Sequence, residues 1–567
     1  MAAKDAAAAT HERVPIIRSN GQWKVDGTEP LNPNEAWKQE DGGLAVRKRI
    51  ENVYSVGGFD SIDPTDLHGR FRWWGLYTQR KPGIDGGKTA NLEPNELEDK
   101  FFMLRVRIDG GQLSTAQLRV IGEISAQFGR DTADITDRQN IQLHWIRVED
   151  VPEIWRRLEN VGLGTTEACG DTPRVVLGSP LAGIAADELI DPTETIRAIT
   201  ARYVGDPEFA NLPRKFKTAI TGHPSQDVVH EINDVAFVAV EHPELGVGYD
   251  LWVGGGLSTA PRLAVRLGTF IPPAEVPEVW CGVISIFRDY GYRRLRAKAR
   301  LKLLVADWGV EKFRTVLETE YLRRALHDGP PPPVPITAGD HIGIHPQKDG
   351  RWYVGVAPFV GRVSGSILIG LADLLEQNGS QRLRTTPHQK MVLLDIAHER
   401  LETVVSALDA LGLSATPSLF RRGTIACTGI EFCKLAIVET KQTAINTIFE
   451  LDRRLAKIKV PQAISLHING CPNSCARIQT ADIGLKGQLL PDGNGGQEPG
   501  FQVHLGGGIA SVDREVAGLG RTVRGLKITG AGLADYVERL VRRFLADRNS
   551  SETFAQWCHR AEEDALR

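Results

Sequence analysis

The sequence lacks the features that mark membrane, secreted and polyanion-binding proteins. Its 567 residues contain no run of eighteen apolar residues, so we expect no membrane-spanning helix. Lys and Arg number 68 against 71 Asp and Glu, a net charge of −3, which argues against a dedicated binder of nucleic acids or membranes. The first residues lack the apolar core of a secretory signal, and we expect a cytoplasmic protein.

Cysteine is also scarce, and where the cysteines lie is more informative than their number. Seven cysteines are too few, and odd in number, for a disulfide framework. Three of them are scattered along the chain: Cys169, Cys281 and Cys558. The other four lie close together, in a Cys-x5-Cys motif and a Cys-x3-Cys motif: Cys427, Cys433, Cys471 and Cys475.

The chain contains an internal repeat. Residues Ser114–Gly129 have the pattern of a capped amphipathic helix, and Ser364–Gly379 repeat this pattern at an offset of 250. Gln139 aligns with Gln389 at the same offset. Because the register holds over a long stretch, we interpret the chain as a duplication. The alternative is two unrelated α+β domains with similar turn signals.

Each copy begins with a strand–helix–strand–helix pattern and continues into a larger mixed α+β region. Between the copies lies a proline-rich segment, which is typical of a stiff linker. The predicted parts are an extended N-terminal arm (1–95), a smaller and a larger module of copy 1 (96–163 and 164–328), the linker (329–339), and a smaller and a larger module of copy 2 (340–413 and 414–567).

The four clustered cysteines indicate a metal centre. Four thiolates suit either tetrahedral zinc or an iron–sulfur cluster. The x5 spacing is longer than structural zinc sites usually have, and Pro472 directly follows Cys471, as is common at iron–sulfur sites. Four reduced cysteines without a metal are the remaining alternative. Aligned between the copies, Cys471 falls on His223 and Cys475 on Asp227, so we expect one centre, held by copy 2.

Two predicted strands place cations on one face. Arg105 lies on one face of an alternating strand at 103–108, and Lys215 and Lys217 share one face of a strand at 214–220. Taken alone, either pattern also fits a solvated strand face.

The two cysteine motifs, Asp137–Asn140, Asn211–Lys217 and the duplicated layout together resemble the siroheme-dependent nitrite and sulfite reductases. The resemblance extends from about residue 65 onward and is strongest to actinobacterial ferredoxin-dependent assimilatory sulfite reductases. It implies an α+β, internally duplicated, pseudo-two-fold fold with two ferredoxin-like half-modules and two larger mixed α+β modules that bind siroheme.

The resemblance also implies cofactors and site residues. The four cysteines would hold a 4Fe–4S cluster, and Cys475 would in addition ligate the siroheme iron. Siroheme carries eight carboxylates, so its pocket must be cationic, and Arg138 would contact one of them. The implied cations on the substrate side are Arg105, Arg174, Lys215 and Lys217.

The activity implied is the six-electron reduction of sulfite to sulfide in sulfur assimilation. The glycine runs at 254–256 and 506–508 do not match the dinucleotide pattern, and no flavin or nicotinamide module is apparent, so we expect reduced ferredoxin as donor. We expect a monomer. Three alternatives stay open: a ferredoxin-dependent nitrite reductase, a siroheme-free iron–sulfur electron carrier and a zinc-stabilised structural protein.

Tyr77 and Cys169 bear on the choice between sulfite and nitrite. Their pattern resembles the actinobacterial sulfite reductases, in which this Tyr and Cys are joined by a thioether bond. On the other interpretation, Cys169 is a small buried apolar residue, which is common for a free cysteine. We therefore expect sulfite as substrate, with both residues close to the siroheme.

Overall fold

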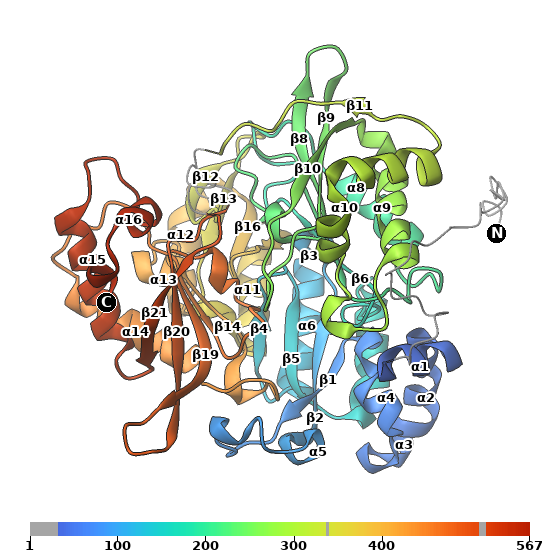
Figure 1. Cartoon of the computed structure of the whole chain (residues 1–567), viewed down its shortest axis with the longest axis horizontal. Helices are drawn as coiled ribbons and strands as arrows, with labels where there is room; N and C mark the ends of the chain where they lie inside the picture. The colour runs from blue at the N-terminus through green and yellow to red at the C-terminus, as the bar shows by residue number, and fades with distance from the viewer. Residues whose placement is uncertain (1–31, 336–338, 510–517) are drawn as a thin grey trace.

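The computed structural model describes residues 32–335, 339–509 and 518–567. The start of the predicted arm (1–31), part of the linker (336–338) and a segment of the last module (510–517) lie outside the described residues. Among the described residues, no helix is both long and apolar enough to cross a membrane. Figure 1 shows the two smaller modules in the middle of the molecule and the two larger ones at its sides.

The sheets of the smaller modules exchange strands. The first sheet has the order β1 (Leu76–Arg80), β2 (Glu98–Val106), β5 (Ile141–Ile146), β4 (Ala133–Ile135) and β14 (Arg362–Val363). The second has the order β12 (Gly343–Pro346), β13 (Trp352–Val356), β16 (Met391–Ile396), β15 (Arg382–Thr385) and β3 (Gln112–Ser114). Strand β14 of copy 2 thus closes the sheet of copy 1, and β3 of copy 1 closes the sheet of copy 2, as a pseudo-two-fold axis requires.

The predicted repeat helices form and pack against each other. Helix α6 (Thr115–Phe128) has Ser114 as its N-cap, with a capping box to Gln117. Helix α11 (Gly365–Gln377) is capped by Ser364 in the same way, except that it has no reciprocal bond. The two helices approach closely at Gly122, where a Cβ atom would lie 2.8 Å from the carbonyl oxygen of Gly365. Helices α7 (Val151–Asn160) and α12 (Leu401–Ala410) add to the same core.

The larger modules repeat one sheet topology. In copy 1 the order is β11 (His327–Asp328), β10 (Val265–Ile271), β9 (Gly246–Val253), β8 (Val235–His242), β7 (Phe216–Thr221) and β6 (Pro173–Gly178). In copy 2 it is β17 (Thr424–Ala426), β18 (Leu466–Asn469), β19 (Ile483–Pro491), β20 (Gln497–Leu505) and β21 (Arg521–Thr529). In both copies three parallel strands are followed by antiparallel ones.

Helices cover these two sheets and complete their cores. In copy 1 these are α8 (Thr193–Tyr203), α9 (Val276–Tyr290) and α10 (Leu301–Val316). In copy 2 these are α14 (Lys441–Arg454), α15 (Leu533–Asp547) and α16 (Phe554–Arg560), with the short α13 (Leu419–Gly423). Each larger module therefore has a hydrophobic core of its own.

The duplication extends to single side chains. Gln139 and Gln389 both have a φ angle of 58°, in the left-handed region. The side-chain amide of Gln139 bonds the backbone N–H and C=O of Gly178, and that of Gln389 bonds the same two groups of Ala426. Each glutamine thus ties a smaller module to its larger one.

The described part of the arm differs from the expected extended chain. It forms the short helices α1 (Pro33–Glu40), α2 (Val46–Arg49), α3 (Ser55–Gly57), α4 (Pro64–His68) and α5 (Pro94–Leu97), and α1 to α4 lie together at the lower right of Figure 1. The side chains of Asn32 and Asp63 cap α1 and α4, and each is followed by a proline at the first helical position. Strand β1 then joins the arm to the first sheet.

Candidate active site

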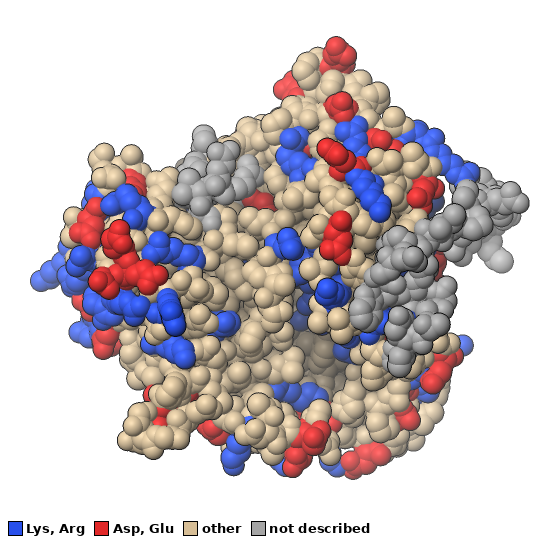
Figure 2. Space-filling model, viewed as in Figure 1, with Lys and Arg blue, Asp and Glu red and all other residues tan. Residues whose placement is uncertain are grey.

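A cavity lies between the two modules of copy 1 and the cysteine loop of copy 2. It holds about 810 Å³ of empty space, part of it open to solvent. Seven Lys and Arg side chains line it: Arg105, Arg138, Arg174, Lys215, Lys217, Arg300 and Arg477. Among its described lining residues, only Asp137 carries a carboxylate, and Cys475 lies at the same wall. Figure 2 shows blue Lys and Arg side chains along a hollow near the middle of the drawn face.

The five predicted cations reach this cavity from different elements. Arg105 extends from β2, in which Leu104 and Val106 point the other way into the core, so the predicted alternation is confirmed. Arg138 lies in the turn between β4 and β5, and its guanidinium is fixed by Asn233 Oδ1 at 2.8 Å. Arg174 lies on β6, while Lys217 lies on the neighbouring β7, directly after Lys215 and Phe216.

The cations share a buried and strongly positive environment. Burial lowers the pKa of Lys215 to about 7, and the positive charges of Arg300 and Arg174 add to this effect. Burial also lowers the pKa of Lys217 well below its usual value, with Arg138 as the next cause. Groups that repel one another in this way favour a bound anion, because an anion relieves both the repulsion and the desolvation.

Several donors in the cavity have no hydrogen-bond partner within the described part of the chain, although Arg477 Nε lies 3.8 Å from Asp137 Oδ2. These buried atoms are Arg138 Nε, Arg300 Nε, Arg477 Nε and Arg477 Nη2. A buried guanidinium nitrogen without an acceptor is unfavourable, so the site is built for a ligand that brings acceptors. Siroheme, with its many carboxylates, fits this requirement.

Tyr77 and Cys169 come together at the same site. Arg105 donates from Nη1 to the Sγ atom of Cys169 over 2.8 Å, and Cys169 is fully buried. Burial raises the pKa of Tyr77, and the neighbouring Cys169 thiol raises it further. Cys169 thus lies against Arg105 and within electrostatic range of Tyr77, although neither Tyr77 nor Cys169 is among the described residues that line the cavity.

The four clustered cysteines follow two adjacent strands. Cys427 comes directly after β17, and Cys471 comes shortly after β18. Because β17 and β18 are parallel, their carboxyl ends meet at one edge of the sheet. The backbone N–H of Gly470 donates to Cys427 Sγ over 3.1 Å, the kind of bond that stabilises a ligating thiolate.

The cysteines interact electrostatically with one another. The pKa of Cys427, of Cys433 and of Cys471 is raised by burial and then by the charge of Cys475. All four are free thiols, and Cys475 is the exposed one, facing the cavity. In the described ranges, no three metal-ligating side chains are arranged to hold a single metal ion. The donor set of four thiols fits a 4Fe–4S cluster, with Cys475 at the boundary to the cavity.

A polar network occupies the equivalent position in copy 1. The buried carboxylate of Asp227 accepts hydrogen bonds from Ser179 and Thr221 at 2.7 and 2.9 Å, and it lies 2.7 Å from Nε2 of His341. His223 is bonded through Nδ1 to Ser225. Both residues that replace cysteines thus have structural partners, as expected for a copy that keeps only the scaffold.

Sequence reasoning missed two cations of the cavity, Arg300 and Arg477. Arg300 ends a basic run that begins at Arg293, and Asp234 holds its Nη2 atom at 3.1 Å from both carboxylate oxygens. Arg477 follows Cys475 by two residues and has a left-handed φ of 57°. The basic run and the position beside the cysteine motif were the available signals.

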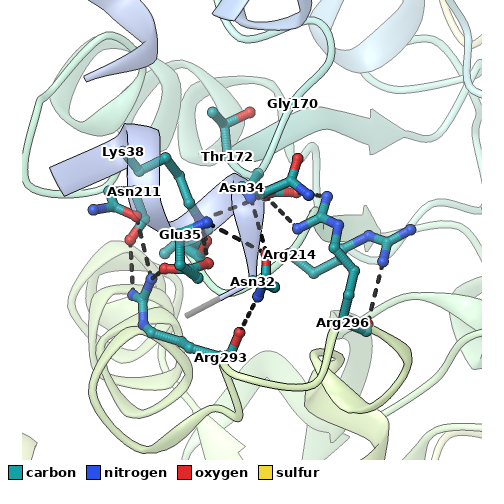
Figure 3. Close-up of polar contacts among 12 residues, drawn as sticks. Asn32, Asn34, Glu35, Lys38, Gly170, Thr172, Asn211, Arg214, Arg293 and Arg296 are labelled. Atoms are coloured by element: carbon teal, nitrogen blue, oxygen red, sulfur yellow. Dashed lines mark hydrogen bonds and ion pairs between the residues drawn. The ribbon is translucent and has the colours of Figure 1, made fainter. Parts of the chain in front are cut away.

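The arm contacts the loop that carries Cys169. Figure 3 shows Asn32, Glu35 and Lys38 of α1 directed toward the segments around Thr172, Asn211 and Arg293. The carboxylate of Asp171, two residues after Cys169, is bonded by both Nη atoms of Arg296 at 2.7 and 2.8 Å, and Lys38 Nζ lies 3.5 Å away. The arm therefore fixes one wall of the active site.

Comparisons with known proteins agree with this geometry. The model of the nitrite and sulphite reductase 4Fe-4S domain matches residues 169–326 and 420–567, and that of the nitrite/sulfite reductase ferredoxin-like half domain matches 95–161 and 345–411. The chain is 60% identical to the "Sulfite reductase [ferredoxin]" of Mycobacterium tuberculosis over 98% of this chain and 100% of the relative.

A more distant relative and a solved structure complete the comparison. The "Assimilatory ferredoxin-dependent nitrite reductase" of Haloferax mediterranei is 33% identical over 94% of this chain and 92% of its own. The solved structure of the Mycobacterium tuberculosis NirA protein superposes with a TM-score of 0.94 at 59% identity, over 97% of this chain and 100% of that chain. On this evidence the chain belongs to the nitrite and sulphite reductase family, with duplicated ferredoxin-like half domains and 4Fe-4S domains.

Proposed function

We propose that this protein is a ferredoxin-dependent assimilatory sulfite reductase that reduces sulfite to sulfide. One observation carries the proposal: Cys475, the exposed member of the four-cysteine group, opens into a cavity lined by seven cations. The cysteines would hold a 4Fe–4S cluster, and the cavity would hold siroheme, with Cys475 in contact with both. When bound, these groups supply the iron that takes the substrate sulfur and the electrons that reduce it.

The cations of the cavity have two proposed roles. Arg138, Arg300 and Arg477 each have a guanidinium nitrogen without a hydrogen-bond partner among the described residues, and we assign them to siroheme carboxylates. Arg105, Arg174, Lys215 and Lys217 are assigned to the substrate oxyanion. Reduction of sulfite to hydrosulfide takes up six electrons and seven protons and releases three waters. Fixed guanidinium groups hold the anion, and a lysine ammonium can also donate a proton to a departing oxygen.

Tyr77 and Cys169 support sulfite over nitrite. The charge of Cys169 acts on the phenol of Tyr77, and Arg105 contacts Cys169 at 2.8 Å; we propose that a thioether joins Tyr77 and Cys169 in the mature enzyme. Closing this bond breaks one S–H and one ring C–H bond and releases two protons and two electrons, which an oxidant of the dioxygen class takes up. The rigid phenol would then shape the space for pyramidal sulfite. The relatives also favour sulfite as the substrate, because the named sulfite reductase is 60% identical to this chain and the named nitrite reductase is 33% identical.

The remaining assignments complete the proposal. Reduced ferredoxin is the electron donor, as in the named relatives. We propose a cytoplasmic monomer. We also propose that it binds neither nucleic acid nor membrane, because its net charge is only −3. The domain boundaries given above for the arm, linker and four modules are retained as our division of the chain.

The test is cofactor and product analysis of the purified protein. About five irons per chain are expected, four for the cluster and one for siroheme, together with haem-like visible bands. Reduced ferredoxin and sulfite should yield sulfide, with six ferredoxins oxidised per sulfide formed. A colourless protein with one zinc per chain, or a protein with a cluster and no siroheme bands, would contradict the proposal.

A further inference from the structure

Strand β1 links the substrate pocket to the cysteine loop. Tyr77, near one end of the strand, lies within electrostatic range of Arg105 and Cys169, and Arg80 ends the strand at the other side. The backbone N–H of Arg80 donates to the carbonyl oxygen of Phe432 over 2.8 Å, directly before Cys433. A single short strand of the arm therefore contacts both parts of the proposed active site.

The guanidinium of Arg80 is buried in this contact, with only 1% of the residue exposed. Its Nη1 atom donates to the carbonyl oxygen of Ala436 at 3.2 Å and to the hydroxyl of Thr89 at 3.1 Å. Its Nη2 atom donates to the carbonyl oxygens of Ile84 and Asp85, each at 3.1 Å. None of these acceptor groups is charged, and Nε has no partner within the described residues.

A buried cation whose hydrogen bonds go to neutral groups needs a negative charge nearby. Burial lowers the pKa of Arg80, and the charges that oppose this are those of Cys433 first and Asp85 second. Cys433 is a ligand of the proposed cluster. The residue also contacts both sides of Cys433 directly, since its backbone N–H bonds Phe432 and its Nη1 atom bonds Ala436.

The same contact holds the shape of the cysteine loop. Thr89 Oγ1 donates to the carbonyl oxygen of Ala436 over 2.8 Å, beside the bond from Arg80. Gly86 packs so tightly that a Cβ atom there would lie 1.7 Å from the carbonyl oxygen of Ile437. On the other flank, Lys434 bonds Glu98 Oε2 at 2.6 Å. The segment after Cys433 is therefore fixed by the arm on one side and by β2 on the other.

We propose that Arg80 is a positioning residue of the 4Fe–4S cluster, which fixes the turn from Cys433 to Ala436 and raises the reduction potential of the cluster. Reduction adds one negative charge to the cluster, and a fixed positive charge in a low-dielectric site stabilises that state. The inference rests on the proposed function, because it takes Cys433 as a cluster ligand.

The experiment compares holoenzyme variants by redox titration of the cluster, followed by electron paramagnetic resonance. Arg80→Gln removes the charge, Arg80→Lys keeps it without the planar fork, and Lys81→Met removes the same charge from the adjacent exposed side chain. We expect a more negative midpoint potential in R80Q and an unchanged one in K81M. In R80K we expect a potential close to wild type but faster loss of iron to a chelator.

A wild-type midpoint potential in R80Q would overturn the inference. If R80Q fails to retain the cluster, the R80K variant is the deciding one. A cluster retained in R80K with a near wild-type potential supports the role of the charge. Loss of the cluster in R80K, or a potential shifted away from wild type, contradicts that role. Absence of a cluster signal from the wild-type enzyme would instead contradict the proposed function.

Discussion

The Nη1 atom of Arg105 lies 2.8 Å from the Sγ atom of Cys169. Burial alone would lower the pKa of Arg105, but nearby Cys169, Tyr77 and Cys475 raise it above its usual value. One permanently charged group thus lies among the cysteine thiol, the phenol and the exposed cluster ligand. The guanidinium positions the Cys169 thiol through this contact, and its positive charge partly offsets the rise that burial causes in the pKa of Tyr77.

The first prediction concerns this pair. Digestion of the wild-type enzyme and mass spectrometry should show the Tyr77 and Cys169 peptides crosslinked, with two hydrogens fewer than the separate peptides. Cys169→Ala should abolish the crosslink and impair sulfite reduction more than nitrite reduction. Cys281→Ala, at a cysteine remote from the cavity, is the control and should change neither. Recovery of the two peptides unlinked from active enzyme would refute the crosslink.

The second prediction concerns the two lysines of the cavity. Lys215→Ala or Lys217→Ala should lower turnover by about one hundredfold or more, because each change removes a donor to the departing oxygen. The iron content and visible spectrum should stay at wild-type levels. Lys298→Ala, at an exposed position of the basic run, should leave turnover unchanged. Wild-type turnover in both cavity variants would show that the substrate site has been misplaced.

Much of this architecture could be predicted from the sequence because it is local or periodic. The caps at Ser114 and Ser364 are fixed by side chains next to the helices they begin. The alternation around Arg105 follows from the geometry of a strand. The cysteine spacing and the register of the repeat were enough to predict one metal centre and two modules per copy.

Other features depend on contacts between distant segments, and the local pattern does not encode them. The exchange of β3 and β14 between the two sheets joins residues of different copies. Arg477 and Arg300 enter the cavity only because the copies face each other. The helices of the arm had a local signal, at Asn32–Pro33 and Asp63–Pro64, which its Trp, Gly and Pro content obscured.

A third prediction concerns the arm and its contact with Asp171. Burial alone would raise the pKa of this carboxyl, but Lys38 and Arg296 hold it well below the usual range. Asp171→Asn leaves Arg296 without its counter-charge, at a cost of about 3 to 5 kcal/mol for a buried pair, while Lys38 keeps its ion pair with Glu35. The melting temperature should fall by several degrees. Glu194→Gln, which breaks an exposed pair with Arg197, should barely change it.

The pH dependence of this stability follows from the sign of the shift. The pKa of Asp171 is lower in the folded than in the unfolded chain, so its contribution is complete above about pH 4 and is lost as the pH falls further. The difference in melting temperature between wild type and D171N should therefore shrink in acid. A difference that is absent at neutral pH, or that grows in acid, would contradict the role of this network.

A fourth prediction concerns Cys475. Cys475→Ser should cost both the cluster and stable siroheme binding, because this thiol belongs to the four-cysteine group and also faces the cavity. Iron analysis and the visible spectrum should show both losses, while Cys281→Ser should retain both cofactors. If C475S retains the spectra of both cofactors, Cys475 does not hold the cluster and the siroheme as proposed.

The most direct test of the account is the comparison of sulfite and nitrite as substrates of the wild-type enzyme with reduced ferredoxin as donor. The proposed link between Tyr77 and Cys169 and the cationic wall of the cavity predict a higher kcat/KM for sulfite, with sulfide as product. A higher kcat/KM for nitrite, with ammonia as product, or no turnover of either anion by enzyme that contains both cofactors, would contradict the account.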